Sequence, residues 1–200
     1  MPYNTSARGN GPWFQGIKKE SATQKHKLGE VRRLEDGRVF VYCKNGSGTL
    51  AAAKLLQAEA ANANAHNEAI AAAAAIGATE LTVTFGGAIT ANAYKEGYLH
   101  VNDEAGEGHI YKVKEHAAGT SSVTVYLEEP VEVALVASTS EITFTKHPCK
   151  DVIVCPTTLT AIIVGVPLIA VTAEYYFWAQ VKGPCPLLFH TGSGGAAAIG

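Results

Sequence analysis

Residues 163–185 read IVGVPLIAVTAEYYFWAQVKGPC and hold the densest group of aromatic side chains in the chain. Four consecutive aromatic residues, Tyr175, Tyr176, Phe177 and Trp178, lie in an apolar segment between Gly-Val-Pro and Gly-Pro. In a strand, the first and third of these side chains face one way and the second and fourth face the other. We therefore expect this strand either to be central to the fold or to turn one face to another subunit.

Alternation of apolar and polar residues extends this strand pattern toward the N-terminus. Leu81, Val83 and Phe85, for example, alternate with threonines, as in a strand with one buried face. Further strand-like segments, separated by Gly or Pro, are residues 37–43, 98–101, 109–114, 123–127, 142–145, 152–155, 162–166 and 175–181. Strands at such intervals predict a mainly β fold, an antiparallel sandwich or barrel.

One segment has helical character instead. Thr49 precedes the run LAAAKLLQAEAA, whose residues have high helix propensity, and Thr49 is a suitable N-cap. The sequence therefore predicts one short alanine-rich helix that ends at about residue 60. The five alanines Ala71–Ala75 are compatible with a helix or with a strand of small residues, so residues 67–76 stay open between the two.

The charges are few and unevenly placed. Charged residues make up 17% of the chain, below the usual value of about a quarter, which indicates a surface partly covered by partners. Residues 1–33 contain seven basic and two acidic side chains, a net charge of +5 in a chain with a net charge of −2. We expect residues 1–27 to form an extended basic arm, residues 28–190 a β-rich domain, and residues 191–200 a flexible glycine–alanine tail.

The arm carries Trp13 and Phe14 as candidate anchors on a partner. It lacks the dense Arg/Lys runs and interleaved stacking aromatics of a nucleic-acid-binding module. We therefore expect the arm to dock on protein and not on nucleic acid.

The sequence contains little that points to catalysis. It has neither a G-x-S-x-G nucleophile turn nor a phosphate-binding Gly-Lys-Ser/Thr loop. The densest group of metal-type donors lies within ten residues and comprises His100, Asp103, Glu104, Glu107 and His109. Its spacing lacks the twelfth-position acid of a calcium loop, and a hairpin explains it better. We expect a non-enzymatic protein without catalytic residues, metal or cofactor.

The cysteines and the longest apolar run fit a soluble β protein. Cys43, Cys149, Cys155 and Cys185 form no CxxC pair, and we expect buried free thiols. The run from Val152 to Val171 has about the length of a membrane span. Prolines, a glycine and threonines interrupt it, so two strands joined by a turn are the better interpretation, and no membrane partner is expected.

Several motifs together resemble a known family. They are LEDGRVFVY at 34–42, ATELTVT at 78–84, GYLHVND at 97–103 with GEG at 106–108, GVP at 165–167 with AVTA at 170–173, and YYFWAQ at 175–180 with GP at 183–184. With these motifs, residues 28–190 resemble uncharacterised structural proteins of tailed bacteriophages.

The resemblance implies a capsid decoration or cement protein. Such proteins bind the outside of the head, often as trimers, and reinforce contacts between major capsid subunits. The expected partners are the major capsid protein and further copies of the chain, on a virion assembled in the host cytoplasm. The aromatic residues are the expected interface, namely Trp13, Phe14, Tyr175, Tyr176, Phe177 and Trp178. The alternative is a phage spike or fibre protein that binds host-surface glycans, with Tyr94, Tyr98 and His100 as candidate contacts.

Overall fold

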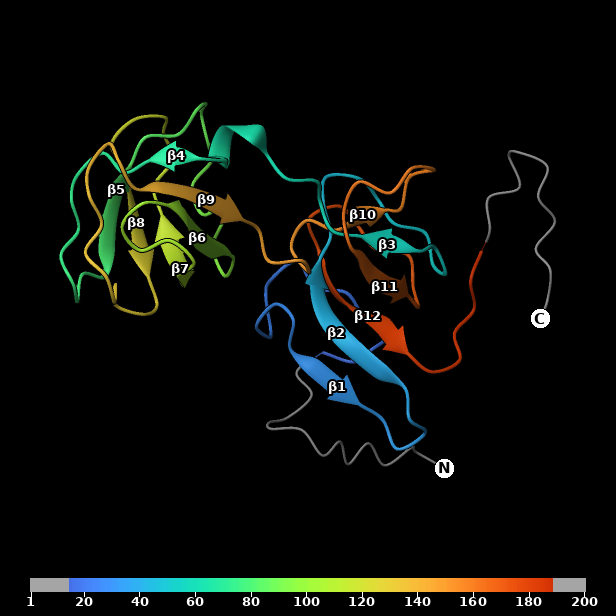
Figure 1. Cartoon of the computed structure of the whole chain (residues 1–200). Helices are drawn as coiled ribbons and strands as arrows, with labels where there is room; N and C mark the ends of the chain where they lie inside the picture. Colours follow the sequence, from blue (N-terminus) through green and yellow to red (C-terminus); the bar gives the residue numbers. More distant parts are fainter. Residues whose placement is uncertain (1–14, 189–200) are drawn as a thin grey trace. The chain divides into compact units, whose positions relative to one another are not determined.

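The computed structural model describes residues 15–188, which form two compact units (Figure 1). Unit 1 contains the described residues up to Glu59 and from Pro148 onward, and unit 2 contains Ala60–His147. Each unit is built on one six-stranded sheet whose strands pair antiparallel. The mainly β, antiparallel fold predicted from the alternation is confirmed, but the β-rich region predicted as one domain over residues 28–190 is divided into two units.

Unit 1 holds the aromatic segment at the centre of its sheet. Its strands are β1 (Val31–Arg33), β2 (Val39–Lys44), β3 (Leu56–Gln57), β10 (Ile153–Val154), β11 (Ile163–Pro167) and β12 (Tyr176–Lys182). Their order in the sheet is β1-β2-β12-β11-β3-β10, so β12 pairs with β2 on one side and β11 on the other. The chain leaves unit 1 after β3 and returns before β10, and these two strands are neighbours. Unit 2 is therefore an insertion between adjacent strands.

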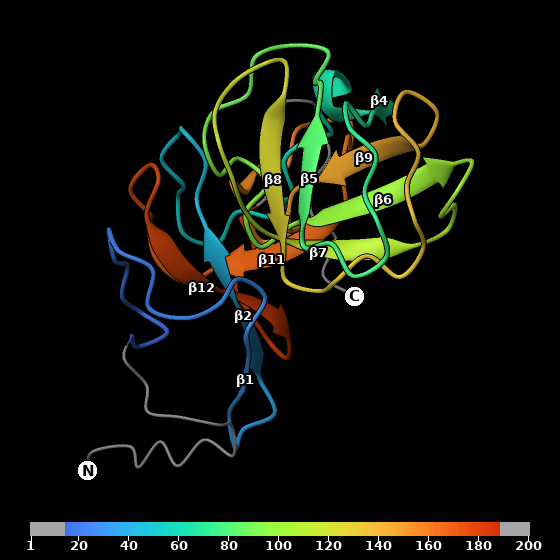
Figure 2. The ribbon, with the colours of Figure 1, turned by 90° about the vertical axis from the view of Figure 1, so that its left-hand side faces the viewer.

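Unit 2 is a small, nearly closed barrel. Its strands are β4 (Glu68–Ala69), β5 (Glu80–Val83), β6 (Tyr98–Asp103), β7 (Ile110–His116), β8 (Val123–Leu127) and β9 (Glu141–Thr145), in the order β4-β9-β6-β7-β8-β5. Ile70 bridges Val83, and the Ala71 N–H donates to the Thr82 carbonyl at 2.8 Å, so the chain after β4 lies beside β5. Figure 2 shows these strands curving around a common core. The segment left open at residues 67–76 is therefore extended, not helical.

The alanine-rich helix predicted over residues 49–60 is wrong. Leu50 bridges Val171, the Ala53 N–H donates to the Pro167 carbonyl at 2.8 Å, and Leu56–Gln57 form β3. Helix propensity separates ordinary residues by less than about 1 kcal/mol each. Burial of Leu50 and Leu56 in the core outweighs that preference. Within residues 15–188 the only helical element is η1, a 3-10 turn at Ala63–Ala65.

The arm predicted over residues 1–27 is described only from Gln15, and from there it belongs to unit 1. Residues 15–28, called the strap below, lie against the sheet. Ser21 and Tyr176 exchange both backbone hydrogen bonds, at 3.0 and 2.8 Å, and Leu28 is buried. The described part of the predicted arm, from Gln15 on, therefore pairs with the sheet of its own unit. Trp13 and Phe14, and the tail predicted at 191–200, lie outside the described residues.

Candidate functional site

The strand predicted to form an interface is buried inside unit 1. Phe177 and Trp178 are both 0% exposed. In the sheet, Phe177 pairs with Cys43 and Trp178 pairs with Tyr42, and the two pairs face opposite sides. Of the two alternatives predicted for this strand, the central position in the fold is therefore the one observed, with both faces of the strand covered. Phe177 and Trp178 have no surface to offer a partner, which corrects their assignment to an interface.

Tyr175 and Tyr176 are only partly buried, so a part of each ring reaches the surface. Tyr176 lies parallel to the ring of Tyr42 with 6.0 Å between their centroids. The two tyrosines are the described members of the predicted interface that retain an accessible edge.

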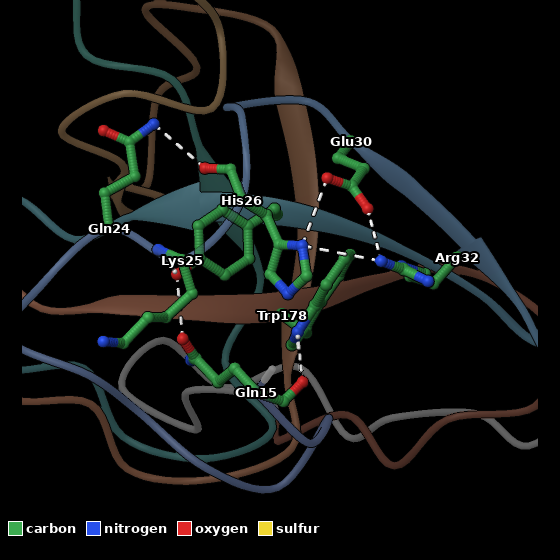
Figure 3. Close-up of polar contacts among 8 residues, drawn as sticks. Gln15, Gln24, Lys25, His26, Glu30, Arg32 and Trp178 are labelled. Carbon is green, nitrogen blue, oxygen red and sulfur yellow. Dashed lines mark hydrogen bonds and ion pairs between the residues drawn. The ribbon is translucent and has the colours of Figure 1, made fainter. Parts of the chain in front are cut away.

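Trp178 joins the strap to the sheet (Figure 3). Its indole N–H donates to the backbone carbonyl of Gln15 at 3.0 Å. The ring of Tyr42 meets it edge-on at a centroid distance of 5.0 Å, and the ring of His26 lies at 5.1 Å. The Arg32 guanidinium lies 5.7 Å from the centroid of the indole ring. One tryptophan on β12 thus holds residues from the strap, β1 and β2.

The side chain of Gln15 completes this anchorage. Its Nε2 donates to the carbonyls of Lys19 and Tyr176, both at 2.8 Å, and its Oε1 accepts from the Tyr42 hydroxyl at 2.8 Å. The Tyr42 oxygen in turn accepts from the Lys25 N–H at 3.1 Å. Burial raises the pKa of Tyr42 to about 12, so its hydroxyl remains a donor at neutral pH.

A charged group is buried beside these rings. Arg32 is 2% exposed, and its Nη2 lies 2.6 Å from Glu30 Oε1. His26 Nδ1 lies 3.2 Å from the other oxygen of Glu30 and 3.5 Å from Arg32 Nη2 (Figure 3). A histidine beside a carboxylate is a pair that enzymes use as a base, but here the imidazole is enclosed by Tyr42 and Trp178. These contacts join the strap to β1.

Sequence reasoning did not identify this cluster. In β1, Arg32 is buried between exposed Val31 and Arg33, and nothing in the local sequence marks this arrangement. Hydrophobicity alone predicts the opposite order. The contacts that reverse it come from Trp178, far along the chain.

The exposed apolar side chains of unit 1 gather near the edge strand β10. We call the following set the edge patch: Ile153, Val154, Leu159, Ile162, Ile163, Leu187 and Leu188. Ile153 and Ile163 both pair with Gln57, from opposite sides of β3. The Ala58 N–H donates to the Ile162 carbonyl just after β3, and the Leu188 N–H donates to the Ala53 carbonyl on the segment before β3. The edge patch is the largest group of exposed apolar side chains in unit 1 and was not singled out from the sequence.

The segment from His100 to His109 forms the predicted hairpin, in which His100 pairs with Ile110. His100 Nε2 lies 2.9 Å from the Thr145 hydroxyl, and burial lowers its pKa. His109 Nδ1 lies 2.9 Å from the Gly106 carbonyl oxygen. In the part of the chain that the structure describes, no three His, Cys, Asp or Glu side chains are placed to hold a metal ion. Tyr94, a candidate glycan contact, is buried in the core of unit 2.

The four cysteines are free, as predicted, but only two of them are buried. Cys43 and Cys149 lie in the core of unit 1, where burial and the neighbouring Cys149 raise the pKa of the Cys43 thiol well above its usual value. Cys155 is partly accessible and Cys185 is exposed. The buried Cys43 and Cys149 contribute to the core as small apolar side chains.

No protein-family model matches this chain, and comparisons with curated proteins and with solved structures found no match. Between Gln15 and Leu188, no helix is long and apolar enough to cross a membrane. The resemblance of residues 28–190 to phage structural proteins therefore stays a prediction from the sequence motifs.

Proposed function

We propose that this chain is a non-enzymatic virion structural protein, a capsid decoration protein that reinforces a bacteriophage head. The observation that carries the proposal is the edge patch. Seven large apolar side chains are exposed around one edge of a sheet whose central strand is covered on both faces. Groups of exposed apolar side chains of this kind are typical of protein–protein contacts. The motif resemblance supplies the class of partner, which is the major capsid protein.

Three features support an attachment role. The strap is anchored to Trp178, and β12 is paired on both sides, so we expect unit 1 to bind a partner with little change in its backbone. The edge strand β10 is short, with two residues, and its flanking side chains are apolar. Trp13 and Phe14 precede the anchor at Gln15, so the proposed docking arm is shortened to residues 1–14. Attached copies would meet one another on the capsid surface, as trimers in the arrangement that the resemblance implies.

Co-expression with the major capsid protein of the encoding phage tests the proposal. The chain should sediment with assembled shells. Leu159→Asp with Ile162→Asp should reduce its occupancy by roughly 100-fold or more, because each buried Leu or Ile contributes about 1.5–3 kcal/mol. Ile76→Asp in unit 2 is the matched control, because Ile76 is 69% exposed against 58% for Leu159 and 62% for Ile162.

Assembled shells that leave the unaltered chain in the supernatant would contradict the decoration role. Equal occupancy of the double variant and the control would contradict the assignment of the edge patch. Deletion of residues 1–14 tests the arm separately, because it leaves Gln15 and its hydrogen bonds in place.

A further inference from the structure

The two units carry opposite net charges. Unit 1 has twelve basic and seven acidic side chains, a net charge of +5, and unit 2 has four basic and eleven acidic ones, a net charge of −7. Together these give the −2 of the whole chain. The chain therefore joins a basic sheet unit to an acidic barrel.

The basic charge of unit 1 is concentrated on the strap. We call the following exposed residues the basic strap surface: Lys18, Lys19, Lys25 and Lys27 of the strap, and Arg33 of β1. Among residues 15–188, no ion pair involves any of these five. The acids of the same segment have other partners. Glu20 accepts from the N–H and hydroxyl of Thr172 at 2.6 and 2.9 Å, and Glu30 pairs with Arg32. A cationic surface without internal compensation fits an anionic partner.

Four of the eleven acidic side chains of unit 2 lie at one end of the barrel. We call the following residues the acidic end: Asp103, Glu104, Glu107 and Glu132. Asp103 is the last residue of β6, and Glu104 and Glu107 lie in the β6–β7 loop. The Ser140 hydroxyl fixes this loop by donating to the Ala105 carbonyl at 3.0 Å. Glu132 comes from the β8–β9 connection, and its carboxylate lies 3.8 Å from His109 Nε2. Two connections thus present carboxylates at the same end of the barrel.

We infer that the basic strap surface of one copy binds the acidic end of a second copy. The partner is a second copy because unit 2 of this chain supplies a surface of the opposite charge. The basic strap surface does not suit single-stranded nucleic acid, since residues 15–33 contain no Phe, Tyr or Trp, and Tyr42 and Trp178 beneath them are buried. Every copy carries both surfaces, so the contact can repeat around a closed ring. This contact rests on the proposed decoration role and specifies how neighbouring copies meet.

Sedimentation equilibrium of the full chain over a range of concentrations tests the contact. The unaltered chain should self-associate at low salt, and 0.5 M NaCl should weaken the association by roughly tenfold or more, because the Debye length falls to a few ångströms. Lys25→Glu with Lys27→Glu, or Glu104→Lys with Glu107→Lys, should each abolish self-association. An equimolar mixture of the two double variants should restore association, because the copies again present opposite charges.

Two variants serve as controls, one on each unit. Lys54→Glu changes the charge of unit 1 away from the strap, on the segment that leads into β3. Glu80→Lys with Glu115→Lys does the same on the barrel wall, where both residues pair with Tyr126. Both controls should associate like the unaltered chain. Trp178 fluorescence and circular dichroism confirm that each variant is folded.

A chain that is monomeric at every concentration overturns the inference, as does association that the strap and acidic-end reversals leave unchanged. A salt response that does not depend on concentration places the attraction within one chain and also overturns it. So does a monomer that binds duplex DNA through Lys25 and Lys27. Shell binding without self-association defeats this contact alone, whereas self-association without shell binding defeats the decoration role alone.

Discussion

Gln15 is the residue on which the position of the strap depends. Its backbone carbonyl holds Trp178, and its side chain makes three hydrogen bonds to Lys19, Tyr176 and Tyr42. Gln15→Ala keeps the backbone bond and removes the other three, which leaves the buried Tyr42 hydroxyl without its acceptor. We expect the free energy of unfolding of unit 1 to fall by about 1–3 kcal/mol. Urea unfolding followed by tryptophan emission measures it, because both tryptophans belong to the part of the sequence outside unit 2.

Gln24→Ala is the matched control for this prediction. The Gln24 side chain also donates to a carbonyl, that of His26 at 2.9 Å, but Gln24 itself is exposed. A surface substitution of this kind should change the free energy of unfolding by less than about 0.5 kcal/mol. If both variants unfold at the same urea concentration, Gln15 is not the anchor of the strap.

The buried Tyr42 hydroxyl makes unit 1 sensitive to alkaline pH. Its folded-state pKa is raised to about 12, above the unfolded value of about 10. A raised pKa means that the contribution of the neutral hydroxyl is fully present below pH 10 and is lost as pH rises toward 12. The melting temperature of unit 1 should therefore fall more steeply over this window in the unaltered chain than in Tyr42→Phe. Tyr126→Phe, at a partly exposed position in unit 2, should leave the slope unchanged.

Among the elements, β11 depends on a glycine. Gly165 has φ +154° and lies where the pairing of β11 with β3 shifts register. A Cβ at this position would lie 2.7 Å from the Gln180 carbonyl oxygen on β12. Because that oxygen belongs to the backbone, Gly165→Ala should destabilise unit 1 by about 1–3 kcal/mol. Chemical denaturation followed by tryptophan emission measures this change.

Gly48→Ala provides the comparison for β11, because a Cβ at Gly48 would meet nothing within 4 Å. It should unfold within about 0.5 kcal/mol of the unaltered chain. Equal stability of the two alanine variants would contradict the close approach of β11 to β12 at Gly165.

For the molecule as a whole, the main feature is the insertion of unit 2 between neighbouring strands of unit 1. Each unit has its own buried core. We therefore expect residues 60–147 expressed alone to fold and unfold cooperatively as a β barrel, since separate cores are the mark of separate domains. Circular dichroism of this fragment, which contains tyrosines but no tryptophan, follows its unfolding.

The complementary variant replaces residues 60–147 with a flexible linker of about eight residues, which spans up to about 28 Å. Unit 1 should then retain the tryptophan emission of the intact chain. A disordered fragment together with an unfolded linker variant would mean that the two cores depend on each other.

The local pattern of the chain predicted most of unit 2 and the central strand of unit 1. Alternation of apolar and polar residues predicted β6, β7, β8 and β9. Successive side chains of a strand point to opposite faces, so alternation marks a strand with one buried face whatever the rest of the fold is. The same reasoning failed at residues 49–60. Alanine and leucine favour a helix locally, whereas Leu50 and Leu56 lie in an extended segment that pairs with the chain around β11.

The interface residues were the least predictable. Aromatic composition marked Phe177 and Trp178, but contacts with Cys43, Tyr42 and Gln15 place both in the interior. The edge patch has no signal of its own, because an apolar residue on an edge strand and one on a central strand look alike in sequence.

Local residue order was enough to determine that this chain is an antiparallel β protein with a basic N-terminal segment, because strand periodicity and charge are properties of neighbouring residues. Its division into two units, the burial of the strap and the choice of exposed surface arose in the folded chain alone. These features depend on contacts such as Gln15 with Trp178 and Leu50 with Val171. Their free energy comes from burial between residues far apart in sequence, which no local propensity encodes.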